Sequence, residues 1–144
     1  MIYTTEYDYK FRPIFSDMDG YGWAHHSRYF VWYENARFSI LNQKIHISDA
    51  TFKKYLFPVS DVYSKYYEPV KFGCELIIHV KLEIDDAVPL LKFHYRMIRS
   101  IDGKLMSKGE STHVVTDMNH NILSGPPVEF CRAIKRFKGE NECT

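Results

Sequence analysis

The sequence predicts an α+β fold in which an antiparallel sheet packs against one long helix. A helical segment free of Gly and Pro occupies residues 27–44, and segments with alternating apolar and polar residues lie before and after it. The later segments are joined mostly by short turns, which connect antiparallel neighbours, whereas a doubly wound nucleotide-binding fold alternates strands with helices. With 144 residues, the chain fits a single domain over residues 1–144.

The first strand is predicted over Glu6–Phe15, where apolar and charged residues alternate. The face expected to point inward carries Tyr7, Tyr9, Phe11, Pro13 and Phe15. Because Pro13 lacks the N–H that a sheet ladder needs, we expect this strand at an edge of the sheet. The polar run over residues 16–26 contains Gly20 and Gly22 and is predicted to form a loop.

The long helix is predicted to begin with Ser27 as its N-cap and to end near Lys44. At 100° per residue, one broad apolar face carries Tyr29, Trp32, Tyr33, Ala36, Ile40 and Leu41. Val31 and Phe38 interrupt the polar side, which suggests that other elements or a second subunit cover it. Arg37 falls on the apolar face, so it either extends to solvent or needs a carboxylate or carbonyl partner.

Further strands are predicted over residues 59–67, 75–84, 91–99 and 105–116. In the two middle strands the alternation places these residues inward: Leu76, Ile78, Val80, Leu82, Ile84, Leu91, Phe93, Tyr95 and Met97. Asp102-Gly103 is a hairpin signal between the last two strands. After "SGPP" at 124–127 we expect a short helix or turn.

Composition and charge exclude several classes of partner. Nineteen basic and eighteen acidic residues give a formal charge of +1, which offers no attraction to nucleic acid. No apolar stretch approaches the roughly 20 residues of a membrane-spanning helix, and "MIYTTEYDYK" lacks the features of a signal peptide. We therefore expect a soluble, cytoplasmic protein. The aromatic content of 16% indicates a rich core, an oligomer interface or an apolar ligand cavity.

The cysteines and histidines do not form a recognisable metal site. Cys74, Cys131 and Cys143 are odd in number and lack CxxC spacing, so they are expected to be free thiols. The seven histidines show no metal-ligand spacing with a carboxylate, and no metal is expected. His25 is expected to be solvated or to cap the helix.

The segment "DMDGYGWAHHSRYF" at 17–30 combines acidic residues, glycines and a helix start. Free backbone N–H groups in the first helical turn can polarise a carbonyl or hold an oxyanion. A nearby carboxylate, Asp17 or Asp19, can attack that carbonyl or activate water. An aspartate before a helix is also a common cap or turn residue, so the spacing alone leaves both interpretations open.

Several ordered motifs resemble a known family. Asp19-x-x-Gly22, His26-x-x-Tyr29 and Trp32-Tyr33-Glu34-x-Ala36-Arg37 follow one another as in the hotdog-fold acyl-CoA thioesterases of the 4-hydroxybenzoyl-CoA thioesterase family, YbgC-like branch. "YYEPVKFGCELIIHVKL" and "GESTHVVTDMNHNI" resemble later strands of that family, so the resemblance covers about residues 11–127. It implies a bent antiparallel sheet wrapped around one long central helix, and a homodimer or homotetramer with sites at the subunit interface.

The resemblance also implies roles for individual residues. Asp19 stands at the catalytic carboxylate, as nucleophile or general base. The backbone N–H of His26 would polarise the thioester carbonyl, and its side chain would orient water or substrate. Gly22 would let the loop pass close to the thioester, and Trp23 and Tyr29 would line the acyl or pantetheine channel. No cofactor is implied, because coenzyme A is part of the substrate.

Two neighbouring positions complete these expectations. Asp17 matches the acidic residue two before the catalytic one, and a structural role is expected for it as a partner of Arg37. Trp23, Arg28 and the Cys74-Glu75 pair depart from the family's usual residues, which leaves the acyl specificity open. Two alternatives to an acyl-CoA thioesterase remain: a thioesterase for acyl carrier protein, for which Arg28 would supply a basic mouth, and a non-catalytic acyl-CoA-binding module.

Overall fold

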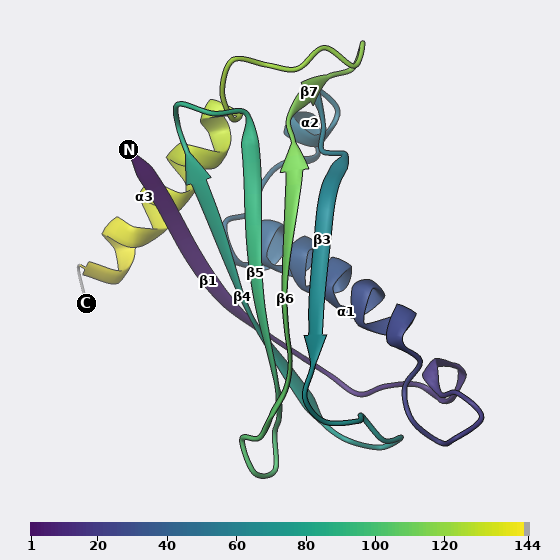
Figure 1. Cartoon of the computed structure of the whole chain (residues 1–144). Coiled ribbons are helices and arrows are strands. Elements are labelled where there is room, and N and C mark those ends of the chain that lie inside the picture. Colours follow the sequence, from purple (N-terminus) through teal and green to yellow (C-terminus); the bar gives the residue numbers. More distant parts are fainter. Residues whose placement is uncertain (143–144) are drawn as a thin grey trace.

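A five-stranded antiparallel sheet forms the body of the protein, and one long helix lies across one of its faces (Figure 1). The computed structural model describes residues 1–142, with side chains described through residue 137. The strands follow the order β1-β4-β5-β6-β3. Their bounds are β1 (Ile2–Phe11), β3 (Val59–Tyr66), β4 (Leu76–Asp85), β5 (Leu90–Arg99) and β6 (Leu105–Val114). This is the α+β arrangement that the alternating segments predict.

Strand β1 lies at the sheet edge, as Pro13 predicts, but its bounds differ from the prediction. It pairs with β4 from Ile2↔Asp85 to Phe11↔Leu76 and ends before Pro13. The alternation continues to Phe15 in the sequence, yet Phe15 lies in a short 3-10 turn (Phe15–Asp17) and is 80% exposed. Backbone pairing, which stops where β4 begins, therefore overrides the apolar pattern at this end.

The long helix α1 spans His26–Ser39 and continues as a wider π-helical turn over Ile40–Lys44. Its cap is His25, not Ser27, because Nδ1 of His25 accepts the Ser27 backbone N–H. The predicted capping role of His25 is thus confirmed. All six residues of the predicted apolar face are buried: Tyr29, Trp32, Tyr33, Ala36, Ile40 and Leu41.

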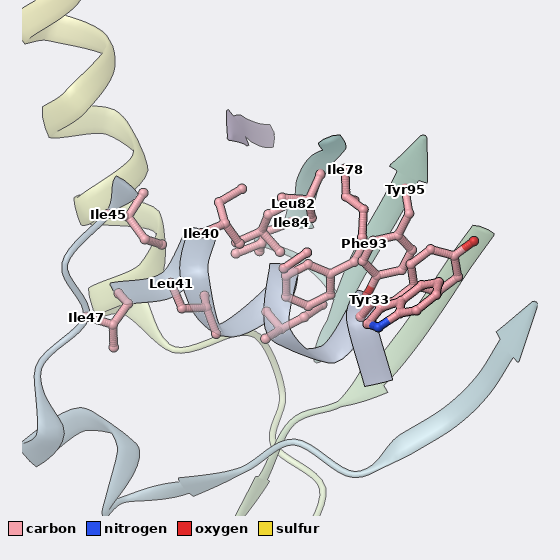
Figure 2. Close-up of a cluster of buried hydrophobic side chains, with 14 of the residues drawn as sticks. Tyr33, Ile40, Leu41, Ile45, Ile47, Ile78, Leu82, Ile84, Phe93 and Tyr95 are labelled. Atoms are coloured by element: carbon pink, nitrogen blue, oxygen red, sulfur yellow. The ribbon is translucent and has the colours of Figure 1, made fainter. Parts of the chain in front are cut away.

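The core fills the space between α1 and the sheet (Figure 2). All nine inward positions predicted for β4 and β5 are buried. In β6, small or polar residues occupy the inward positions: Ser107, Gly109, Ser111 and His113. They leave room for the rings of Tyr33 and Tyr95, which stack with their centroids 4.4 Å apart.

Three smaller elements complete the chain. Helix α2 (Asp49–Phe52) precedes β2 (Tyr55–Leu56), which pairs with β7 (Thr116–Asp117) in a separate two-stranded ladder. Helix α3 (Val128–Glu142) runs beside the N-terminal part of β1 (Figure 1). The prediction of a short C-terminal helix is wrong in length, because Phe130, Ile134 and Phe137 recur at helical spacing and pack on the core.

The other edge strand, β3, and the outer side of α1 carry exposed apolar side chains. Val31 and Phe38 on the helix are 41% and 52% exposed, and β3 presents Val59, Val62, Tyr63 and Tyr66 to the surface. Cys74 and Cys131 are free thiols, and Cys143 lies outside the described residues. Through residue 142, the structure contains no helix with the length and apolar character needed to cross a membrane.

Candidate active site

The loop between β1 and α1 is organised around the Asp19 carboxylate. Oδ1 of Asp19 accepts the backbone N–H groups of Tyr21 at 2.8 Å and Trp23 at 3.1 Å. The backbone of Asp19 bonds the same loop twice more, through Trp23 O and Gly22 N. The second oxygen, Oδ2, has no hydrogen-bond partner among the described side chains, residues 1–137, or the backbone of residues 1–142. The carboxylate is therefore held at one oxygen and free at the other, which is the state a nucleophile or base requires.

Asp17 has a structural role, but its partner is not Arg37. Its side chain is 9% exposed, and Oδ2 accepts the Ile14 N–H at 2.8 Å. Its Oδ1 lies 3.6 Å from Nε of Arg28, and its carbonyl accepts the His25 N–H. Arg37 extends from the opposite half of α1 and bonds the Tyr95 hydroxyl instead. Asp17 thus fastens the loop to the first turn of α1.

The first turn of α1 presents a free donor. Ser27 donates its N–H to His25 Nδ1, and Arg28 donates to the His25 carbonyl. The His26 N–H donates no hydrogen bond to another residue of the described chain. The Tyr66 hydroxyl donates to the His26 carbonyl at 3.3 Å and so ties the helix start to β3. A free N–H at a helix N-terminus carries partial positive charge toward an incoming oxygen.

The other predicted site residues occupy different settings around this loop. Gly22 has φ +81°, and an added Cβ would meet no atom within 4 Å, so its requirement is conformational. Trp23 is 46% exposed, and its backbone forms an isolated β-bridge with Lys71 in the segment between β3 and β4. Tyr29 is 3% exposed, and its ring packs against Trp32 and Tyr66. Burial raises the pKa of Tyr29 to about 12, so its hydroxyl stays protonated at neutral pH.

A cavity that the sequence analysis missed lies further along α1. Its volume is about 390 Å³, and its walls come from the second half of α1, the 52–59 segment, β5 and β6. None of its lining residues belongs to the loop or to the first turn of α1. The lining is mostly apolar, with Arg37 and His113 among the exceptions.

A chain of hydrogen bonds runs behind this cavity. Nη1 of Arg37 donates to the Tyr95 hydroxyl at 3.1 Å. Tyr95 bonds Ser111 at 2.7 Å, and Ser111 bonds Nε2 of His113 at 2.9 Å. Nδ1 of His113 donates to the Phe57 carbonyl at 3.2 Å, which fixes the tautomer and makes Nε2 the acceptor. The sequence signal for these hydrogen bonds is the spacing of Ser107, Ser111 and His113, which places all three on the inward face of β6.

His113 is neutral at physiological pH. Burial lowers the pKa of His113 to about 4, and the nearby Arg37 charge contributes in the same direction. Arg37 therefore carries its positive charge beside an uncharged imidazole. Within the part of the chain whose side chains are described, residues 1–137, no three His, Cys, Asp or Glu side chains gather in a way that would hold a metal ion.

Comparison with known proteins identifies the family of this chain. The model of the Thioesterase-like superfamily matches residues 14–136. A Bacillus subtilis protein named "Putative acyl-CoA thioesterase YneP" is 26% identical over 120 residues, which are 83% of each chain.

Solved structures give the fold. A 1,4-dihydroxy-2-naphthoyl-CoA thioesterase from Synechocystis superposes with a TM-score of 0.78 at 18% identity, covering 91% of this chain and 96% of its own. A hypothetical protein from Aquifex aeolicus has the same TM-score at 24% identity, covering 89% and 98%. The fold is thus shared with these structures, and the chain belongs to the Thioesterase-like superfamily as a thioester hydrolase of the hotdog fold.

Proposed function

We propose that this protein hydrolyses an acyl-CoA to the free acid and coenzyme A, with Asp19 as the catalytic carboxylate. The observation that carries the proposal is the Asp19 side chain, fixed at Oδ1 by two backbone N–H groups and free at Oδ2. The same loop leads within a few residues to the free N–H of His26 at the start of α1. A carboxylate and an electrophilic N–H are the two groups that this hydrolysis requires.

The reaction can follow either of two routes. As a nucleophile, Oδ2 of Asp19 bonds to the thioester carbon, the carbon–sulfur bond breaks, and coenzyme A leaves as the thiolate and takes a proton. Water then cleaves the mixed anhydride and restores Asp19. As a general base, Asp19 instead takes a proton from water, which attacks the carbonyl directly. The carbon–sulfur bond of the tetrahedral intermediate then breaks, and the departing thiolate of coenzyme A takes the proton from Asp19. In both routes the N–H of His26 stabilises the oxyanion, and no metal or redox cofactor takes part.

The names of the relatives support the proposed substrate class. Two structural neighbours are named for aromatic thioesters, 1,4-dihydroxy-2-naphthoyl-CoA and gentisyl-CoA, and YneP is named for acyl-CoA. The alternative of a carrier-protein substrate relied on Arg28 as a basic mouth. In the structure Nε of Arg28 lies 3.6 Å from Oδ1 of Asp17, but the Arg28 side chain is 40% exposed, so this alternative stays a prediction.

A second subunit is part of the proposal. Trp23 is half-exposed beside Asp19, and the apolar surface of β3 and the outer side of α1 is uncovered. An edge strand with free backbone groups and exposed Val59, Val62 and Tyr63 is suited to pairing with a second copy. We infer a homodimer or homotetramer in which the partner closes the site beside the loop. Light scattering tests it, and a monomer would contradict it.

The experiment is free-thiol release from a panel of short, long and aromatic acyl-CoAs. Wild type is compared with Asp19→Asn and with Asp102→Asn, which removes a carboxylate from a hydrogen-bonded glycine turn between β5 and β6. We expect Asp19→Asn to lose at least about 100-fold in kcat while staying folded. Asp102→Asn should retain wild-type turnover. If wild type hydrolyses no acyl-CoA although it binds them, the acyl-CoA thioesterase proposal is wrong, and a binding module or a carrier-bound substrate replaces it.

A further inference from the structure

The cavity behind α1 has an unusual distribution of charge. Its walls include Phe38, Leu41, Phe52, Phe57, Leu91 and Phe93, which would suit an alkyl chain or an aromatic ring. Arg37 is the one arginine or lysine of this lining. Arg37 is half-buried in this apolar wall, where a partner of opposite charge would stabilise its guanidinium.

Arg37 has no such partner in the described chain. Its hydrogen bond to Tyr95 engages one of five N–H donors and a neutral acceptor. Among residues 1–137, whose side chains are described, no carboxylate lies within 4 Å of its guanidinium. Glu34, one turn earlier on α1, also lines the cavity, but its side chain is exposed and makes no ion pair with Arg37. The charge is therefore available to a ligand.

The groups behind Arg37 hold it in place and are themselves satisfied. Tyr95 is 2% exposed and stacks on Tyr33. Its hydroxyl forms a hydrogen bond with Ser111, and Ser111 forms one with His113. Nδ1 of His113 donates to the Phe57 carbonyl, so this series of hydrogen bonds ends at a backbone group. Tyr95, Ser111 and His113 therefore need no further hydrogen-bond partner. Only the remaining N–H donors of Arg37 lack one in this network. A fixed guanidinium recognises a carboxylate better than a mobile ammonium does.

We propose that this cavity binds an apolar chain or ring that ends in a carboxylate, with Arg37 as the recognition residue. The lining receives the apolar part, and the guanidinium pairs with the anionic end. Resting on the proposed function, the ligand is an acyl group with a second, distal carboxylate, or the acid that hydrolysis releases. Arg37 lies eleven residues beyond His26, roughly 16 Å along the helix, so the distal end of a long acyl group is the part that would reach it.

Binding of two matched probes tests the site without any turnover. Decanoate and decan-1-ol share one alkyl chain and differ in their end group, and calorimetry gives the dissociation constant of each. We expect decanoate to bind wild type at least about tenfold more tightly than decanol. Arg37→Gln should bring the two constants together, whereas Arg37→Lys should retain part of the difference. Arg96→Gln, which removes an exposed arginine from β5, should behave as wild type.

A second variant covers the case in which Arg37→Gln does not fold. Leu56→Glu changes a half-buried lining residue of β2, away from the proposed subunit contact, and places a negative charge at the cavity. It should weaken decanoate binding more than decanol binding. Equal affinities of wild type for the two probes, or a decanoate preference that survives in Arg37→Gln, would overturn the proposal, as would a failure of decanoate to bind at all.

Turnover measurements then show whether the bound carboxylate belongs to the substrate or to the released acid. They also test acyl-CoA hydrolysis separately from carboxylate binding. If dodecanedioyl-CoA is hydrolysed with higher kcat/KM than dodecanoyl-CoA, and Arg37→Gln removes that preference, the cavity reads the distal end of the substrate. If the preference is absent and decanoate inhibits hydrolysis through Arg37, the cavity holds the released acid. If no acyl-CoA is hydrolysed but decanoate binds through Arg37, the carboxylate site stands and the proposed function fails.

Discussion

The loop that holds Asp19 and the cavity that holds Arg37 are built in opposite ways. In the loop, backbone groups do the fixing, since Asp19 is bound by the N–H groups of Tyr21 and Trp23 four residues away at most. In the cavity, side chains from α1, β5 and β6 fix one another. Arg37 and Tyr95, for example, are separated by 58 positions in the sequence. The loop depends on local conformation, whereas the cavity depends on the packing of the whole core.

This difference indicates which properties each region controls. A change in the loop should alter turnover with little effect on stability, because its side chains are largely exposed and its contacts are local. A change behind the cavity should alter stability and carboxylate binding together, because the same buried groups carry both. The following predictions test this separation.

The largest effect is expected at Gly109, under the Tyr33 ring. A Cβ there would lie 2.6 Å from Cε2 of Tyr33 and 2.9 Å from the Tyr63 carbonyl. Gly109→Ala should therefore lower the free energy of unfolding by about 2–3 kcal/mol through overpacking. It should also weaken the preference for decanoate over decanol, because Tyr33 stacks on Tyr95, which holds Arg37. Urea unfolding and calorimetry measure the two effects, and an unchanged stability would refute the close packing.

An acid-dependent loss of stability is expected from His113. Its pKa is about 4 in the folded protein and about 6.5 when unfolded, so the unfolded state binds the proton more readily. The contribution of His113 is thus present above pH 6.5 and is lost as the pH falls toward 4, by about 2 kcal/mol between pH 7 and pH 5. His113→Gln should be less stable at pH 7 but should lose less stability over that interval. Urea unfolding at pH 7 and at pH 5 measures the loss of stability for both proteins. If wild type and His113→Gln lose the same free energy of unfolding over this interval, His113 is not the cause.

The smallest effect on stability is expected at Gly22, on the loop side of the comparison. Its φ of +81° strains a β-branched residue, by about 1–2 kcal/mol, but is tolerated better by asparagine. Gly22→Val should lower kcat/KM about tenfold, and Gly22→Asn should lower it less. Both variants should melt within a few degrees of wild type. A Gly22→Val protein with wild-type kcat/KM would show that the loop conformation does not position Asp19.

Much of the fold could be predicted from the sequence because each element carries its own periodicity. The alternation in β4 and β5 and the helical spacing of α1 place their buried residues correctly. The errors lie at ends of elements, where neighbours decide. Phe15 continues the alternation of β1 but has no strand left to pair with, and His25 displaces Ser27 as the cap because its ring nitrogen reaches the Ser27 N–H.

The candidate site divides in the same way. The Asp19 loop could be predicted because its groups are adjacent in sequence. The partner of Asp17 could not: Arg37 is expected from the sequence, but Arg28 is the arginine beside Asp17 in the structure. The Arg37 cavity could not be predicted, because periodicity places Arg37, Tyr95 and His113 on inward faces without showing which of them meet. That information exists only in the register of β5 against β6 and in how α1 lies across them.

The most direct test is the kcat of Asp19→Asn on the best acyl-CoA of the panel, measured on protein whose decanoate dissociation constant has been determined. The account predicts that kcat falls by at least about 100-fold while the dissociation constant stays at the wild-type value. A kcat within about threefold of wild type would contradict the assignment of the chemistry to Asp19. A parallel loss of decanoate binding would contradict the separation of the two regions.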